Sequence, residues 1–202
     1  VMDYLDEVDE TAARIGAVNT IVNRRGRLIG YNTDCPGALA ALRTRTSIKG
    51  KSVALIGAGG AARAIGFGLM AAGARVTILN RTRLSGERLA GDLQAQFLPL
   101  DAWAPDRYEV LINTTPLGMH PETDAAPIPK EELSKNMVVM DIVYNPLETR
   151  LLKEAAAGGC RTINGIEMFV FQGAKQFELW TGQKAPVGVM RAAVLEALQA
   201  HK

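Results

Sequence analysis

Apolar and polar positions divide the chain into two differently patterned parts. Residues 1–14 predict one or two short helical turns, with Asp9 as a cap, and residues 17–31 predict two strands joined by a tight turn. Residues 32–34 are polar and are expected to cap a helix that runs to about residue 45. From residue 51 onward, continuous apolar runs alternate with helical patterns, which is typical of an α/β fold with a doubly wound parallel sheet.

The alternating part supplies the predicted elements of the large sheet. The loop at 115–130 is long and rich in proline. Strands are expected at 53–56, 75–79, 97–98, 110–112, 138–142 and 162–163, and helices at 60–72, 83–95, 148–157, 166–181 and 186–200. The hairpin at 17–31 stands apart, and little else in the chain promises a partner for its apolar side chains, so we expect self-association, for example as a homodimer.

Composition narrows the class of protein. The 202 residues are 48% hydrophobic and carry a formal net charge of +2, so a packed core is expected and a mainly disordered chain is excluded. That charge is too small and too mixed to indicate a nucleic-acid partner. Cys35 and Cys160 are far apart in sequence, and His120 and His201 have no ligand cluster around them, so we expect neither a disulfide nor a metal site.

Residues 52–74 contain one charged side chain, Arg63, and superficially resemble a membrane span. Six glycines interrupt the segment, and its pattern resolves into a strand followed by a helix, so no membrane insertion is expected. The first residues are acidic, unlike a secretory leader, which favours a cytoplasmic location. The Asn-x-Thr triplets at Asn80 and Asn113 end strand-like runs and are interpreted as accidental.

A glycine-rich turn is the strongest motif. It follows the strand at 53–56, opens the helix at 60–72 and fits G-x-G-x-x-A from residue 57 to residue 62. Such a turn allows the backbone to approach a pyrophosphate, and the helix N-terminus offers free N–H groups and a positive dipole end. The residues concerned are Gly57, Ala58, Gly59, Gly60 and Ala61. A Rossmann-like dinucleotide site is therefore predicted, the alternative being glycines used only for packing.

The end of the next strand indicates which dinucleotide is bound. An NAD site usually has an acidic residue there for the ribose 2′-hydroxyl, whereas this strand ends in Asn80, Arg81 and Thr82. No carboxylate repels a 2′-phosphate, and a guanidinium can pair with it for about 1.5–3 kcal/mol. We therefore predict NADP as the cofactor. The alternative is that Arg81 is only a surface residue of the following helix.

Several motifs occur together in a characteristic order. They are IGAVNT (15–20), GYNTD (30–34), GAGGA (57–61), NRT (80–82), NTTPLGM (113–119), DIVYNP (141–146), NGIEM (164–168) and QGA (172–174). As a set, covering nearly the whole chain, they closely resemble the shikimate dehydrogenase family. The resemblance implies reversible, NADP-dependent reduction of 3-dehydroshikimate to shikimate, a step of aromatic amino acid biosynthesis.

The resemblance also implies roles for particular residues. Asn19, Asp34 and Gln172 match substrate-hydroxyl ligands, Tyr144 matches a neighbour of the substrate, and Asp34 also matches the acidic half of a catalytic pair. The implied cofactor contacts are the glycine turn, Asn80, Arg81, Thr82, Thr114, Ile142 and Gly165. The implied domains are a remnant of a smaller α/β substrate domain with its linker helix (1–45), an NADP-binding Rossmann domain (46–183), and a helix packing back toward the substrate domain (184–202).

Two departures from the family pattern matter. The family's Asn-Val-Thr-x-Pro-x-Lys motif, whose Lys is the other half of the catalytic pair, is absent from this sequence, as are the Ser residues that hold the substrate carboxylate. We therefore expect a truncated chain with weak or no activity by itself. The family also often has Arg at the position of Ser85, where Arg83 is a candidate substitute.

Other interpretations stay open from the residues alone. Asp34 is also placed to be a helix N-cap, Asn19 to make a structural hydrogen bond in mid-strand, and Gln172 to be merely exposed. For the whole chain, the alternatives are a non-catalytic NADP-binding or regulatory module and a quinate/shikimate dehydrogenase.

Overall fold

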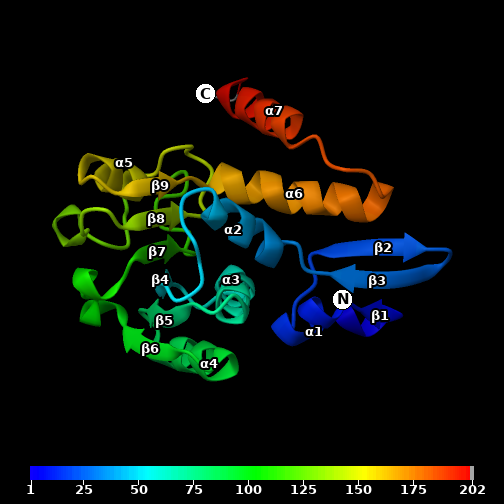
Figure 1. Cartoon of the computed structure of the whole chain (residues 1–202), viewed down its shortest axis with the longest axis horizontal. Coiled ribbons are helices and arrows are strands. Elements are labelled where there is room, and N and C mark those ends of the chain that lie inside the picture. The colour runs from blue at the N-terminus through cyan, green and yellow to red at the C-terminus, as the bar shows by residue number, and fades with distance from the viewer. Residues whose placement is uncertain (201–202) are drawn as a thin grey trace.

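The larger of two sheets carries the glycine turn. In the computed structural model, which describes residues 1–200, six parallel strands lie in the order β6-β5-β4-β7-β8-β9 (Figure 1). The chain steps outward from β4 to β6 and then returns to β7, so the order reverses between β4 and β7. The strands are β4 (Ser52–Ile56), β5 (Arg75–Asn80), β6 (Gln96–Pro99), β7 (Val110–Asn113), β8 (Val138–Asp141) and β9 (Arg161–Ile163). The predicted doubly wound α/β fold is confirmed.

Helices cover both faces of this sheet. The helices that follow its strands are α3 (Gly60–Ala71), α4 (Arg83–Leu93), α5 (Arg150–Ala157) and α6 (Gly165–Thr181), and the last helix, α7 (Val187–Ala200), packs on α6. One face packs Leu55 and Ile112 against Ile65 of α3, and the other packs Leu111 and Val139 against the α5 side. Burial of both faces explains why the central strands are continuous apolar runs.

The smaller sheet differs from the predicted hairpin by one strand. β2 (Thr20–Arg24) and β3 (Arg27–Tyr31) form the expected antiparallel pair, and β1 (Glu7–Val8) adds a parallel strand beside β3. The N-terminal segment is thus not only helical: a 3-10 turn, η1 (Met2–Tyr4), precedes β1, and α1 (Glu10–Ile15) follows it. A strand of two residues is too short to show an alternating apolar and polar pattern in the sequence. Asp9 caps α1 as predicted, accepting from Thr11 N at 3.0 Å.

The hairpin also has more packing partners than the sequence suggested. The side chains of Leu5 and Val18 meet over Gly30, where an added Cβ would lie 2.8 Å from Val18 Cγ2. Trp180 of α6 donates its indole N–H to Ile21 O at 3.0 Å. Val22 and Ile29 are buried, whereas Ile21 remains 38% exposed. The expectation that this chain lacks partners for the hairpin was therefore wrong, while self-association stays a prediction.

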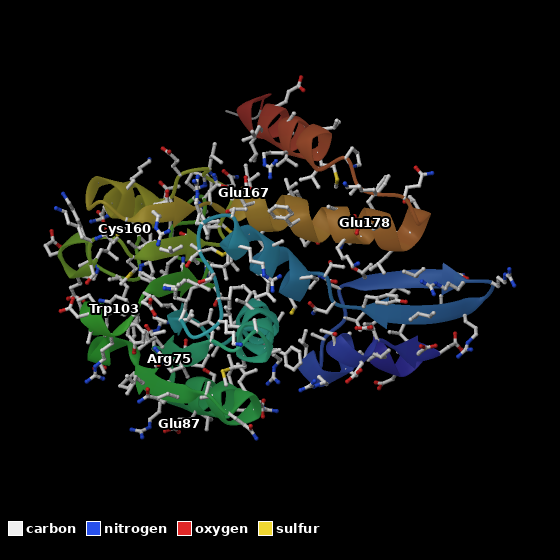
Figure 2. All side chains as sticks on the ribbon, in the orientation of Figure 1. Arg75, Glu87, Trp103, Cys160, Glu167 and Glu178 are labelled. Atoms are coloured by element: carbon white, nitrogen blue, oxygen red, sulfur yellow. The ribbon has the colours of Figure 1, made fainter. Side chains whose placement is uncertain are left out.

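Two long helices connect the sheets. The linker helix α2 (Asp34–Arg43) lies beside α6, and both run between the large and the small sheet (Figure 1). In Figure 2, Glu167 and Glu178 mark the two ends of α6. Helix α7 packs on α6 through Arg191, whose guanidinium binds the Glu167 carboxylate at 2.8 and 2.9 Å. The boundaries predicted at residues 45 and 183 stay a prediction.

Three further features bear on the predictions from composition. None of the helices in residues 1–200 is long and apolar enough to cross a membrane. Cys35 and Cys160 are both free. The same described range contains no group of three or more side chains suited to hold a metal ion, and His201 lies outside it.

Candidate functional site

The turn between β4 and α3 has the geometry that a phosphate requires. Gly57 adopts φ +113°, and its N–H donates to Leu79 O at 2.9 Å. A Cβ at Gly57 would lie 2.5 Å from Thr114 Oγ1, whereas Cβ atoms at Gly59 and Gly60 would meet nothing within 4 Å. No side chain caps α3, and its first turn has no acidic residue. Open space over an uncapped, positive helix end fits a dinucleotide pyrophosphate.

The predicted ribose-phosphate residues lie one strand away, at the end of β5. The Asn80 amide donates to Thr82 O at 2.8 Å and to Ser85 Oγ at 2.9 Å, which fixes the backbone on either side of Arg81. Arg81 is exposed and lines a pocket of about 590 Å³ together with Trp103. Arg83, the candidate substitute for a second arginine, is bound to Glu87 at 2.7 Å. Arg81 is therefore the better-placed guanidinium for a 2′-phosphate.

A second pocket brings distant predicted residues together. Its volume is about 280 Å³, and its lining comes from α2, α3, α6 and the segment after β8. Asp34, Tyr144 and Gln172, three of the four predicted substrate residues, line it beside three predicted cofactor contacts, Ala61, Ile142 and Gly165. The structure thus joins the predicted substrate and cofactor sites into one place.

Asp34 is the first residue of α2 and not its cap. The N-cap residue is Thr33, and the capping oxygen belongs to Asn32, whose Oδ1 accepts from Cys35 N at 3.2 Å. The Asp34 carboxylate is therefore available to the pocket. Burial raises its pKa above the usual range, and a hydrogen bond from the Asn19 side chain opposes that rise.

Asn19 lies just before β2, so its predicted mid-strand position was wrong. Its Oδ1 accepts from Thr20 Oγ1 at 2.8 Å and from Thr33 N at 2.9 Å. The side-chain oxygen of Asn19 therefore makes structural hydrogen bonds, as the alternative interpretation of this residue expected. Because Asn19 bonds to Asp34 and is itself exposed, it still lies at the edge of the site.

Thr33 joins two of the predicted site residues, Asn19 and Gln172, although the sequence analysis assigned it no place in the site. The Thr33 side chain is fully buried. Its Oγ1 lies 3.3 Å from Gln172 Oε1, to which it donates a hydrogen bond, and 3.2 Å from Asn19 Oδ1. Gln172 also donates from Nε2 to Phe169 O at 3.1 Å, so it is held from both ends of its amide. In the sequence, Thr33 belonged to a predicted helix cap and to the GYNTD motif of the resemblance, and neither gave its side chain a role of its own.

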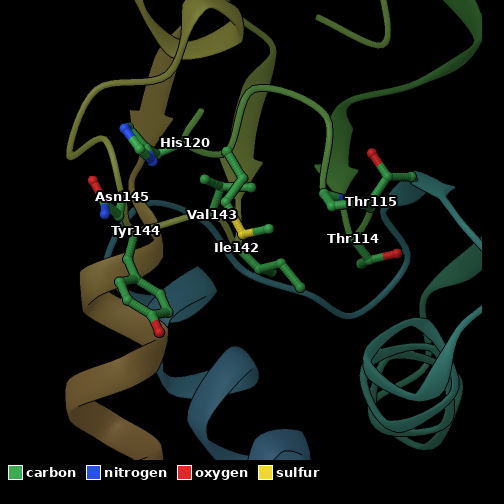
Figure 3. A pocket seen from close by; sticks show the side chains of 9 residues that line it. Thr114, Thr115, His120, Ile142, Val143, Tyr144 and Asn145 are labelled. Atoms are coloured by element: carbon green, nitrogen blue, oxygen red, sulfur yellow. The ribbon is translucent and has the colours of Figure 1, made fainter. Parts of the chain in front are cut away.

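A third pocket, of about 480 Å³, lies at the carboxyl ends of β7 and β8 (Figure 3). Thr114 lines one wall and donates from Oγ1 to Ile56 O at 2.5 Å. Ile142 and Tyr144 line this pocket and the Asp34 pocket alike, so the two adjoin. Figure 3 shows the Tyr144 ring extending along α6, where it packs on Phe169 with ring centroids 5.1 Å apart.

Gly165 holds α6 against this wall. A Cβ at this position would lie 2.5 Å from Val143 O, so only glycine permits the approach of the helix start to the segment after β8. The predicted contacts Ile142 and Gly165 are consequently neighbours in space although 23 positions separate them in the sequence.

Comparisons with known proteins identify the family of this chain. The family model described as "Shikimate / quinate 5-dehydrogenase" matches residues 39–144, and that of the "Shikimate 5'-dehydrogenase C-terminal domain" matches residues 165–195. The shikimate dehydrogenase (NADP(+)) of Methanosarcina mazei is 50% identical over 95% of this chain and 72% of its own length.

Two solved structures that are similar to this chain are also shikimate dehydrogenases. A shikimate dehydrogenase crystallised with NADP+ superposes with a TM-score of 0.94 at 42% identity, covering 98% of this chain and 72% of that one. The Thermus thermophilus shikimate 5-dehydrogenase, in complex with NADP(H) and shikimate, gives 0.90 at 40% identity, with 97% and 74% covered. NADP, predicted from the end of β5, is the cofactor of these relatives. The chain therefore belongs to the shikimate dehydrogenase family.

Proposed function

We propose that this chain binds NADP on the glycine turn and shikimate or 3-dehydroshikimate in the adjoining pocket, as part of a reversible NADP-dependent alcohol dehydrogenation. The observation that carries the proposal is the pocket in which Asp34, Tyr144 and Gln172 meet Ala61, Ile142 and Gly165. Polar side chains that suit a polyhydroxylated ring lie there directly beside the residues that match cofactor contacts.

The residues of this chain divide the work by position. Bound NADP supplies the hydride acceptor or donor. The α3 N-terminus and Arg81 hold the phosphates, and Ile142 and Gly165 form the floor on the substrate side. Asp34 accepts a hydrogen bond from a substrate hydroxyl and orients the acid/base group that exchanges the proton of the reacting oxygen. Gln172, fixed by Thr33, contacts a second hydroxyl.

We further propose that the 202-residue chain by itself binds NADP but turns substrate over weakly. The sequence contains no Asn-Val-Thr-x-Pro-x-Lys, so the lysine expected beside Asp34 has no counterpart here. A positioned acid/base group contributes about 10²–10⁴-fold to such reactions. The alternatives are a non-catalytic NADP-binding or regulatory module and a quinate/shikimate dehydrogenase.

Calorimetry followed by a turnover assay tests these proposals. Titration of the chain with NADP should give saturable binding that NAD matches only at higher concentration; absence of NADP binding by folded protein would refute the proposed cofactor. With NADP and shikimate, reduction followed at about 340 nm should be at least 100-fold slower than for the Methanosarcina mazei relative. Turnover equal to that relative would show that the acid/base group lies elsewhere in this chain, and faster turnover of quinate would favour the quinate alternative.

A further inference from the structure

Asp141 is a buried acid to which the proposed function gives no role. It is the last residue of β8, at the sheet edge that carries the glycine turn, and it is fully buried. Ile142, the next residue, lines both the 280 Å³ and the 480 Å³ pockets. The Asp141 carboxylate lines neither pocket, but Val143, which lines the 480 Å³ pocket, donates its N–H to Asp141 Oδ1, so the charge is joined directly to the wall that the proposed function assigns to the cofactor.

Neutral donors surround this carboxylate. Oδ1 accepts from Asn113 Nδ2 at 3.0 Å and from Val143 N at 3.1 Å, while Oδ2 accepts from Thr149 Oγ1 at 2.7 Å. Asn113 and Thr149 are themselves fully buried. Every partner donates a hydrogen to the acid, which favours the ionised form, although burial raises its pKa to about 6.

No cation compensates the charge. Asp141 takes part in none of the ion pairs formed among residues 1–200. The stretches that contain its partners, 113–120 and 138–150, also contain the titratable side chains of His120, Tyr144, Glu148 and Arg150, and Arg150 is bound to Glu154 at 2.7 Å. Burial alone raises the pKa of Asp141, its three hydrogen bonds oppose that rise, and these four groups make no contribution.

We propose that the ionised Asp141 carboxylate makes the site bind the oxidised, positively charged nicotinamide ring more tightly than the neutral reduced ring. This inference rests on the proposed function, because it requires that the nicotinamide half lies against Ile142. The two redox forms of NADP differ by one unit of ring charge and share every other group. A buried negative charge without a counter-ion lowers the energy of the cationic form selectively, since little water screens it. Asp141 thus acts on the nicotinamide ring through its negative charge and is distinct from the residues that touch substrate.

The test is the ratio of two dissociation constants, that of NADPH divided by that of NADP+, measured by calorimetry on the same protein. In the wild type this ratio should rise severalfold, about tenfold at most, between about pH 5.5 and about pH 8. In Asp141→Asn it should stay low and flat, and the two proteins should converge at the acidic end. The 2′-phosphate also titrates in this range, but it is common to both ligands and cancels in the ratio.

A different result is expected if Asp141 has only a structural role. If Asp141 only fixes the wall, Asp141→Asn weakens both redox forms equally and leaves the ratio unchanged, which would overturn the proposal. Failure of the folded wild type to bind either form would instead overturn the proposed function. His120→Gln removes the histidine of the 480 Å³ pocket, and Asp34→Asn removes the carboxylate of the 280 Å³ pocket. Both variants should keep the rise of the ratio near pH 6.

Thr149 provides a second pair of variants in case Asp141→Asn does not fold. Thr149→Val removes the donor to Oδ2 and should move the rise of the ratio to higher pH, because the ionised acid loses a hydrogen bond. Thr149→Ser keeps the hydroxyl and should keep the wild-type midpoint. Equal midpoints in the two variants would contradict the assignment of the titration to Asp141.

Discussion

Gly37 of the linker helix lies directly against Gln172 of α6. A Cβ at Gly37 would be 2.8 Å from Gln172 Cβ and 2.8 Å from Gln172 N, so the two helices touch backbone to backbone at this point. Gln172 lines the 280 Å³ pocket, and Asp34, which lies one helical turn before Gly37, lines the same pocket. The helix contact therefore sets the separation of two proposed substrate ligands.

Gly37→Ala should displace α6 and weaken shikimate binding while also destabilising the chain. Backbone and Cβ atoms of Gln172 cannot move aside as a flexible side-chain end can, so we expect a loss of about 1–3 kcal/mol in the free energy of unfolding. Urea unfolding measures that loss, and calorimetry with shikimate on the NADP-saturated chain measures the affinity.

Gly91→Ala is the matched control for this substitution. Gly91 is also helical, in α4, but it is exposed and an added Cβ would meet nothing within 4 Å. Alanine there should stabilise the chain by about 0.5–1 kcal/mol and leave shikimate affinity unchanged. If both variants were equally stable, the close contact at Gly37 would have no energetic meaning.

Arg81→Ala should remove most of the preference for NADP over NAD. Arg81 is exposed at the end of β5 beside the β5–α4 turn that Asn80 and Thr82 stabilise. Loss of a charge-assisted bond to the 2′-phosphate corresponds to about ten- to a hundredfold in NADP affinity, with NAD affinity unchanged. Arg83→Ala is the control, because Arg83 is already paired with Glu87. Calorimetry with both cofactors would disprove the assignment if Arg83→Ala had the larger effect.

The fold could be predicted from sequence where its determinants are local. The run from Val53 to Ile56, the turn at Gly57 and the helix behind it are one continuous segment, and the structure confirms them. The strand β1 was missed because Glu7 and Val8 acquire strand geometry only by pairing with β3, which tertiary contacts decide.

The site shows the same limit more strongly. Asp34 and Gln172 face one pocket although 138 positions separate them, and no local pattern signals that proximity; it came from the family resemblance alone. Thr33 was overlooked because a hydroxyl at a helix start is expected to cap, whereas here it bonds to Asn19 and Gln172. Asp141 was overlooked as a functional group because a polar residue at the end of an apolar strand is ordinary, and only its burial distinguishes it.

Asp34→Asn should separate stability from substrate binding. Burial raises the folded-state pKa of Asp34 above the unfolded value of 3.8, so the folded chain binds more protons in that window. Stability from this group is therefore lost as pH rises from the unfolded pKa through the folded one, and the amide should escape this loss. We expect Asp34→Asn to gain stability relative to wild type as pH rises from the acidic range to neutrality.

The same substitution should weaken substrate binding. Shikimate affinity at neutral pH should fall about ten- to a hundredfold, because a bond to a charged acceptor is removed. Urea unfolding at several pH values and calorimetry decide both parts; a stability difference independent of pH would show that Asp34 titrates normally.

The ion pair between Glu167 and Arg191 should attach α7 to α6 with measurable coupling. Two nitrogens of Arg191 each contact one oxygen of Glu167, and the two side chains are only 25% and 32% exposed. Glu167 also lies in the first turn of α6, where a negative charge suits the helix dipole. A double-mutant cycle with Glu167→Gln and Arg191→Met, measured by urea unfolding, should give a coupling energy of about 1 kcal/mol. The same cycle on Arg150 and Glu154, an i,i+4 pair within α5 with Arg150 more exposed, should give about 0.3–0.5 kcal/mol. A coupling at Glu167 no larger than this control would mean that apolar packing alone holds α7 in place.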